Sequence, residues 1–111
     1  MSPEKKEAFE YFVHNLIKWW SEQNPNKEWE ENDLSVMKVM LLLFFTCSAD
    51  HNTIPRTKED AMLDIFDNFR ACAYGHFEWD VYTYIRENKG AFSFFTIGRR
   101  IILTDYSKWL P

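Results

Sequence analysis

The stretch from Leu34 to Ala49, LSVMKVMLLLFFTCSA, most constrains the fold, because nearly every side chain in it is apolar. At about 100° per residue, three of its polar side chains, Ser35, Lys38 and Thr46, share one narrow face, which Leu42 and Phe45 interrupt. A helix that is apolar nearly all round is either a central core helix or a membrane span. Lys38 leaves fewer uninterrupted apolar residues than the roughly 20 that a bilayer requires. The stretch therefore predicts a buried central helix and no membrane span.

A first helix is predicted upstream of this stretch. Ser2 can cap free backbone N–H groups, Pro3 suits a first helical turn, and Glu4 complements the helix dipole. The apolar residues then recur at the spacing of one buried face: Phe9, Phe12, Val13, Leu16, Ile17 and Trp20. Asn24-Pro25-Asn26 is predicted to end the helix, because the residue before a proline disfavours the helical conformation.

Two further helices are predicted downstream. The third follows the capping pattern Thr57-x-x-Asp60 and ends at Tyr74-Gly75, where glycine would supply a left-handed cap. Its inner face comprises Ala61, Met62, Ile65, Phe66, Phe69, Cys72 and Ala73. The fourth helix spans roughly Glu78 to Asn88, turns Val81, Tyr82 and Ile85 toward the core, and ends at Asn88-Lys89-Gly90.

The C-terminal part of the chain predicts a β-hairpin. Phe92–Thr96 and Arg100–Thr104 are rich in β-branched and aromatic residues and are separated by the glycine-containing turn Ile97-Gly98-Arg99. Such a hairpin must lean on the helices, and Trp109 is expected to pack back onto them. The sequence thus predicts one α+β domain over residues 1–111, predominantly helical, with about four helices around a central apolar helix and a small C-terminal β-hairpin.

Composition narrows the functional classes. The hydrophobic content of 46% allows a real core, and the aromatic content of 18% favours a contact surface, because a small domain cannot bury every ring. The formal charge of −4 disfavours binding to nucleic acid or to an anionic membrane. The charged start MSPEKKEAFE lacks the apolar segment of a signal peptide, so a cytoplasmic protein is expected.

Metal binding and catalysis are not favoured. The candidate metal ligands are Cys47, Asp50, His51, Cys72 and His76. The spacing Cys-x3-His occurs twice among them, but zinc needs four converging ligands, and two buried free thiols with two surface imidazoles are the simpler interpretation. A nucleophile pair of Cys47 or Ser48 with His51 lacks an oxyanion loop. Gly98-Arg99-Arg100 is a small basic spot that we interpret as a solvated turn. No cofactor, metal or catalytic residue is predicted.

Several aromatic residues fall outside the predicted core faces: Trp19, Trp29, Trp79 and Tyr84. Tryptophan and tyrosine are frequent interface hot spots, although such residues can also cover the edges of a small core, and both interpretations stay open. The segment Tyr74 to Tyr84 would hold its outer side chains rigidly. The predicted protein-binding residues are His76, Trp79, Asp80 and Tyr84, with Trp19 or Trp29 nearby.

Two blocks resemble a known family. Residues 37–45, MKVMLLLFF, are similar to the "KLxKLLYFA"-like helix of the Panacea domain, the SocA-like, phage-associated antitoxin family. Residues 69–82, FRACAYGHFEWDVY, resemble that family's "FxAxxYGPVExDVY" signature. The matching positions are Phe69, Ala71, Tyr74, Gly75, Glu78, Asp80, Val81 and Tyr82. The resemblance covers roughly residues 8–85 and departs at His76, where the family usually has proline, and at Phe77, where it has valine.

The resemblance implies direct protein binding. Such domains neutralise a toxin encoded beside them, and some deliver that toxin to a protease. Phe69, Tyr74, Gly75, Val81 and Tyr82 would then be structural residues of the signature. Two other classes stay open, namely a small transcriptional regulatory or DNA-binding domain, for which no basic recognition helix is evident, and a small enzyme with a Cys/His site. The oligomeric state and the identity of the partner do not follow from the sequence.

Overall fold

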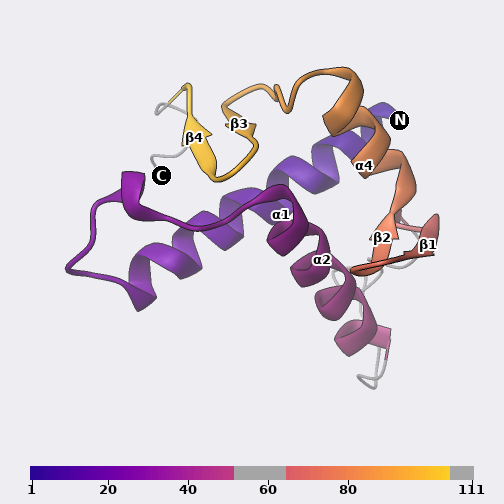
Figure 1. Ribbon diagram of the computed structural model, residues 1–111, viewed down its shortest axis with the longest axis horizontal. Coiled ribbons are helices and arrows are strands. Elements are labelled where there is room, and N and C mark those ends of the chain that lie inside the picture. The colour runs from indigo at the N-terminus through magenta and orange to yellow at the C-terminus, as the bar shows by residue number, and fades with distance from the viewer. Residues whose placement is uncertain (52–64, 106–111) are drawn as a thin grey trace.

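The structure, a computed structural model, describes residues 1–51 and 65–105, without the side chains of residues 49–51. The elements are α1 (Pro3–Gln23), the 3-10 turn η1 (Trp29–Glu31), α2 (Val36–His51), β1 (Phe69–Cys72), β2 (Gly75–Glu78), α4 (Trp79–Glu87), β3 (Phe95–Ile97) and β4 (Ile101–Leu103) (Figure 1). Four predicted features lie outside the described residues: the cap Thr57-x-x-Asp60, Ala61, Met62 and Trp109.

Helix α1 begins and ends where the sequence predicts. Ser2 is its N-cap, and the Ser2 Oγ accepts a hydrogen bond from the Lys5 backbone N–H at 3.1 Å. The helix stops before Asn24, whose backbone N–H donates to the Trp20 carbonyl. Its predicted apolar face is buried except at Phe12, which is half-buried. Local capping and periodicity therefore suffice to define this helix.

Helix α1 contacts both the C-terminal segment and the turn η1. Figure 1 shows it crossing the molecule, with α4, β3 and β4 along one side in this view. The Phe9 ring lies 5.2 Å from the Phe92 ring and 6.5 Å from the Phe95 ring, measured between centroids. At its other end, Trp20 meets Trp29 edge-on at 5.3 Å. Helix α1 therefore connects the C-terminal segment to the turn that precedes α2.

The prediction of about four helices around a central buried helix is wrong. Residues 1–51 and 65–105 contain three α-helices and two two-stranded antiparallel sheets. Helix α2 buries Val39, Met40 and Leu43 completely, but Met37 is 40% exposed and Phe45 is 60% exposed. The described elements pack on only part of the surface of α2, so its other apolar side chains stay accessible. Within the described residues, no helix is long and apolar enough to span a membrane.

The predicted third helix is wrong over its C-terminal half. Residues 69–72 form β1 and pair antiparallel with β2, with Phe69 opposite Glu78 and Cys72 opposite Gly75. The hairpin packs on α2, where the Phe44 ring lies 5.6 Å from Phe69. Cys72 is consequently exposed, contrary to the prediction of two buried thiols, whereas Cys47 is buried as expected.

Gly75 has the predicted positive φ, +135°, but in a hairpin turn and not in a helix cap. The α+β part of the prediction is partly consistent with the structure, in which the described residues 69–78 between α2 and α4 form a second hairpin. Apolar spacing at Phe66, Phe69, Cys72 and Ala73 resembled a helical face. A four-residue strand cannot be separated from a helical turn by periodicity alone, because its own pattern is too short.

Helix α4 and the C-terminal hairpin match the prediction. Val81 and Ile85 of α4 are buried, and Tyr82 is half-buried. The helix ends with Lys89 and Gly90 at positive φ, and the Gly90 N–H donates to the Ile85 carbonyl at 2.7 Å. Strands β3 and β4 pair antiparallel in the register that places Ile97 opposite Ile101.

Asn32 attaches the C-terminal hairpin to the segment before α2. The residue is 5% exposed. Its Oδ1 accepts hydrogen bonds from the backbone N–H groups of Ile101 and Leu34, at 3.1 and 3.2 Å. Its Nδ2 donates to the carbonyls of Ile101 and Trp29, at 3.0 and 2.7 Å. One side chain thus satisfies four backbone groups and positions β4 beside the start of α2.

Candidate functional site

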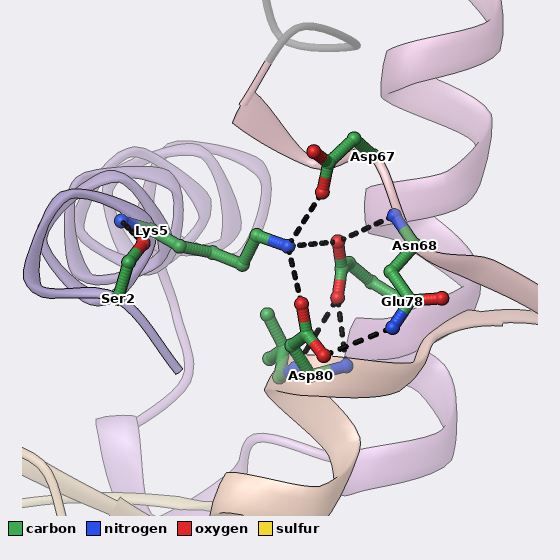
Figure 2. Close-up of polar contacts among 7 residues, drawn as sticks. Ser2, Lys5, Asp67, Asn68, Glu78 and Asp80 are labelled. Atoms are coloured by element: carbon green, nitrogen blue, oxygen red, sulfur yellow. Dashed lines mark hydrogen bonds and ion pairs between the residues drawn. The ribbon is translucent and has the colours of Figure 1, made fainter.

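A lysine surrounded by three carboxylates joins α1 to the segment of residues 67–80 (Figure 2). The Lys5 Nζ lies 2.8 Å from the Asp67 Oδ1, 2.9 Å from the Glu78 Oε2 and 2.7 Å from the Asp80 Oδ2. An ammonium has three N–H donors, so the three carboxylates use all of them. The Lys5 side chain is only 7% exposed, which makes this arrangement a partly buried ionic cluster.

Glu78 holds the cluster and caps α4 with the same side chain. It is fully buried. Its Oε1 accepts from the backbone N–H groups of Asp80 and Val81, at 2.8 and 3.3 Å, which are the free donors of the first turn of α4. Its Oε2 accepts from the Asn68 backbone N–H at 3.1 Å. The end of β2 and the start of α4 are therefore fixed to the Lys5 ammonium through one carboxylate.

The pKa values of Lys5, Asp67 and Asp80 shift in the directions expected for ion pairs. Burial alone would lower the pKa of Lys5, but its hydrogen bonds to Asp67, Asp80 and Glu78 outweigh burial and raise that pKa well above its usual range. The hydrogen bond from Lys5 lowers the pKa of Asp67. The same contact, with a hydrogen bond from Asn68, lowers the pKa of Asp80. Lys5, Asp67 and Asp80 therefore stay ionised at neutral pH.

The three carboxylates could ligate a metal ion, but the Lys5 ammonium occupies the position between them. One oxygen each from Asp67, Glu78 and Asp80 lies within 4.8 Å of the others, close enough to share a metal ion. The Lys5 ammonium already contacts all three. We interpret the cluster as a structural ion-pair network that holds α1 against residues 67–80. Sequence reasoning missed it because Lys5 lies 62 residues from Asp67, and no local pattern links them.

The cysteine–histidine pairs do not form a recognisable site in the described part of the chain. Cys47 is buried on α2, and the side chain of His51 lies outside the described atoms, as does that of Asp50. Cys72 is exposed at the β1–β2 turn, and its Sγ donates to the Gly75 carbonyl at 3.0 Å. His76 stacks on the Phe44 ring at 5.0 Å.

The predicted protein-binding residues lie in separate surroundings. The Trp79 ring stacks on Tyr82 at 5.6 Å, and the Arg70 guanidinium lies over it at 5.5 Å. Tyr84 packs on Phe92 at 5.1 Å. Five residues apart on α4, Trp79 and Tyr84 point about 140° away from each other. Asp80 belongs to the ionic cluster, and His76, on β2, packs against Phe44 of α2.

A shallow cleft of about 440 Å³ lies beside Trp79, lined by Trp79, Tyr82, Thr83, Arg86 and Glu87. The four predicted residues thus do not share one surface, and a binding role for each stays a prediction. Trp29, expected near them, is half-buried against Trp20, and its indole N–H is buried with no hydrogen-bond partner among the described residues. The burial of this N–H indicates that Trp29 packs inside the fold and is not an exposed contact residue.

An apolar groove lies between α1 and α2. Its volume is about 480 Å³, and it is lined by Ala8, Tyr11, Phe12, Asn15, Leu16, Trp19, Leu42, Thr46, Ile65 and Phe66. Tyr11 is 71% exposed and Trp19 is 50% exposed. The sequence held a signal for it, because residues 8, 11, 12, 15 and 19 form a second stripe on α1 beside the core stripe.

The residues of the second resembling block fall on β1, β2 and α4. Phe69 lies on β1, Tyr74 is 65% exposed at the hairpin turn, and Val81 is buried. No family model, no curated protein and no solved structure matches this chain.

Proposed function

We propose that this chain is a protein-binding module whose partner packs an apolar helix face into the groove between α1 and α2. In line with the resemblance to the Panacea family, its biological role would be to neutralise a toxin encoded beside it. The observation that carries the proposal is the groove itself, with Tyr11 and Trp19 exposed at its wall.

The composition of the groove supports a protein partner. Its lining is apolar except for Asn15, Thr46 and the Tyr11 hydroxyl, which matches a helix face with few hydrogen-bonding groups. Tryptophan and tyrosine bring a large contact area with few rotatable bonds. Both rings stand on a 21-residue helix, so little conformational freedom is lost when a partner binds.

Charges beside the groove indicate the chemistry of the partner. Glu4, Glu7 and Glu22 each lie about one helical turn from a groove residue of α1, where Lys18 is the opposing charge. On α2, Lys38 is paired with Asp33 and is therefore neutralised locally. We expect the partner helix to carry lysine or arginine beside its apolar face, and we expect binding to weaken as salt concentration rises.

Co-expression with the product of the adjacent gene, followed by pull-down and titration, tests the proposal. Trp19→Ala and Tyr11→Ala should each weaken capture by on the order of 2 kcal/mol without unfolding the domain. Tyr74→Ala is the matched control, because this exposed aromatic residue lies at the β1–β2 turn, outside the groove. Failure of the parent protein to capture the neighbour, or equal binding by the Trp19 and Tyr74 variants, would contradict the proposal.

The surface around Trp79 is the second candidate for the same function. The Trp79 ring stacks on Tyr82 and lies under the Arg70 guanidinium, and the Arg86 guanidinium lies over the Tyr82 ring, so two cations stand beside this aromatic pair. Trp79→Ala should cost on the order of 2 kcal/mol of binding if the partner uses this surface. A loss with Trp79→Ala but not with Trp19→Ala would move the assigned surface to α4.

The other roles rank lower on physical grounds. The net charge of −4 works against a DNA-binding regulatory role. The complete burial of Cys47 works against an enzyme with Cys47 as the nucleophile. Delivery of the partner to a protease, and a cytoplasmic location, are expectations that follow from the resemblance and from the charged N-terminus.

A further inference from the structure

A basic cleft lies at the end of the C-terminal hairpin, remote in sequence from the residues that line the α1–α2 groove. Its volume is about 520 Å³, and its described lining is Lys89, Thr96, Ile97, Gly98, Arg99, Arg100 and Ile102. The sequence alone showed only a basic turn. The structure adds Lys89 from the end of α4 and a concave surface, so that three cations line one cleft without an aspartate or glutamate among the described lining.

These cations are not neutralised within the described part of the chain. None of the ion pairs found there involves Lys89, Arg99 or Arg100. The Arg100 Nη1 donates to the Glu30 backbone carbonyl at 2.9 Å, which holds the guanidinium while leaving its charge uncompensated. In a protein of net charge −4, this concentration of positive charge is local and attracts anions.

The backbone at Lys89 is an independent observation. Lys89 has a φ of +53°, the left-handed conformation that usually belongs to glycine at the end of a helix. A lysine there is strained, and residues held in strained conformations are concentrated at functional sites. Lys89 follows α4, so the cleft is lined by residues of two separate segments of the chain.

We propose that this cleft binds a phosphate dianion, either free or as the terminal group of a small organophosphate. Guanidinium groups match the oxygen geometry of phosphate, and lysine adds a point charge. The cleft volume falls in the range of small-molecule sites, and Ile102, 50% exposed, offers an apolar wall beside the cations. This inference goes beyond the proposed function and does not depend on it.

The test is an amide-shift titration of isotope-labelled protein with inorganic phosphate at constant ionic strength, with chloride as the reference salt. Saturable shifts should appear at Lys89, Thr96 and Arg99. Lys89→Gly should weaken phosphate binding by about tenfold. The same substitution should raise the urea midpoint, because glycine relieves the positive φ, so lost binding could not be attributed to unfolding.

Lys18→Ala on α1 is the matched control, because it removes an exposed positive charge outside the cleft and should leave phosphate binding unchanged.

Adenosine monophosphate and inorganic phosphate distinguish the two sources: tighter binding of the nucleotide supports an organophosphate, and equal binding supports free phosphate. Absence of saturable shifts, or equal binding by parent and Lys89→Gly, would overturn the proposal. A single-stranded oligonucleotide that binds more tightly than the nucleotide through the same residues would also overturn it.

Discussion

Asn32 and Glu78 are single side chains that each satisfy several backbone groups between distant segments. Asn32 serves four such groups around Ile101, and Glu78 serves three N–H groups besides the Lys5 ammonium. A buried backbone group without a hydrogen-bond partner is destabilising, so these residues contribute more than their size suggests. Both lie outside the apolar stripes from which a core is usually inferred.

Asn32→Ala should lower the free energy of unfolding by about 3 kcal/mol, because it leaves both backbone groups of Ile101 and the Leu34 N–H buried without their partner. Urea unfolding followed by circular dichroism measures this loss. Asn15→Ala is the control, since the Asn15 amide is exposed and donates only to the Tyr11 carbonyl. Equal midpoints for the two variants would show that Asn32 does not hold the hairpin.

Gly75→Val should also destabilise the fold clearly. The φ of +135° at Gly75 is unfavourable for a β-branched residue, and a Cβ there would lie 2.6 Å from the Leu41 Cδ2. Gly98 provides the comparison, because a Cβ at Gly98 meets nothing within 4 Å and Gly98→Ala should be nearly neutral. An unchanged melting temperature for Gly75→Val would show that the hairpin does not approach α2 as described.

At the scale of elements, α2 is a one-sided helix despite its apolar sequence. It packs against β2 and leaves Phe45 exposed. Beside its exposed side, Leu42 and Thr46 of α2 line the groove. Helix α1 has the complementary arrangement, with one stripe in the core and a second along the groove.

Two adjacent substitutions on α2 test this arrangement. Leu43 is fully buried, so Leu43→Asp should prevent folding by leaving an unpaired carboxylate in the interior. Leu42 is half-buried at the groove, so Leu42→Asp should leave a folded domain with weaker partner binding. Circular dichroism and thermal melting report the difference. A folded, fully stable Leu43→Asp variant would refute the described orientation of the helix.

At the scale of the whole molecule, stability should depend on pH through the Lys5 cluster. The lowered pKa values of Asp67 and Asp80 give stability that is present above the unfolded pKa of aspartate, about 3.9, and is lost as pH falls through their folded values. The raised pKa of Lys5 gives stability that is full below about 10.4 and is lost as pH rises through its folded value. The cluster should therefore stabilise most between these limits.

Lys5→Met separates the cluster from the other groups that titrate. At neutral pH this variant should lose about 3 kcal/mol, because Glu78 would be buried without its counter-charge. Mild acid should then restore part of the loss by neutralising carboxylates, whereas the parent protein loses stability over the same interval. Denaturant midpoints measured across the pH range give the pH dependence of stability for both proteins. The same dependence in the parent and in Lys5→Met would show that the cluster does not control the loss of stability in acid.

The sequence by itself determined the elements that carry their own local signals. Ser2 and Pro3 define the start of α1, and the Val81 and Ile85 spacing with Gly90 defines α4. The C-terminal hairpin follows from its β-branched strands and the turn at Gly98. Caps, periodicity and turn residues act within a few positions of each other, so each of these elements can be predicted from its own segment of sequence.

Tertiary structure decided what depends on partners distant in sequence. Residues 69–72 are a strand because residues 75–78 pair with them and α2 covers the hairpin. Lys5 is buried because three carboxylates from other segments converge on it. The apolar sequence of α2 is compatible with burial on any side, so which of its sides is buried, and with it the groove, was decided by how the other described elements pack against it.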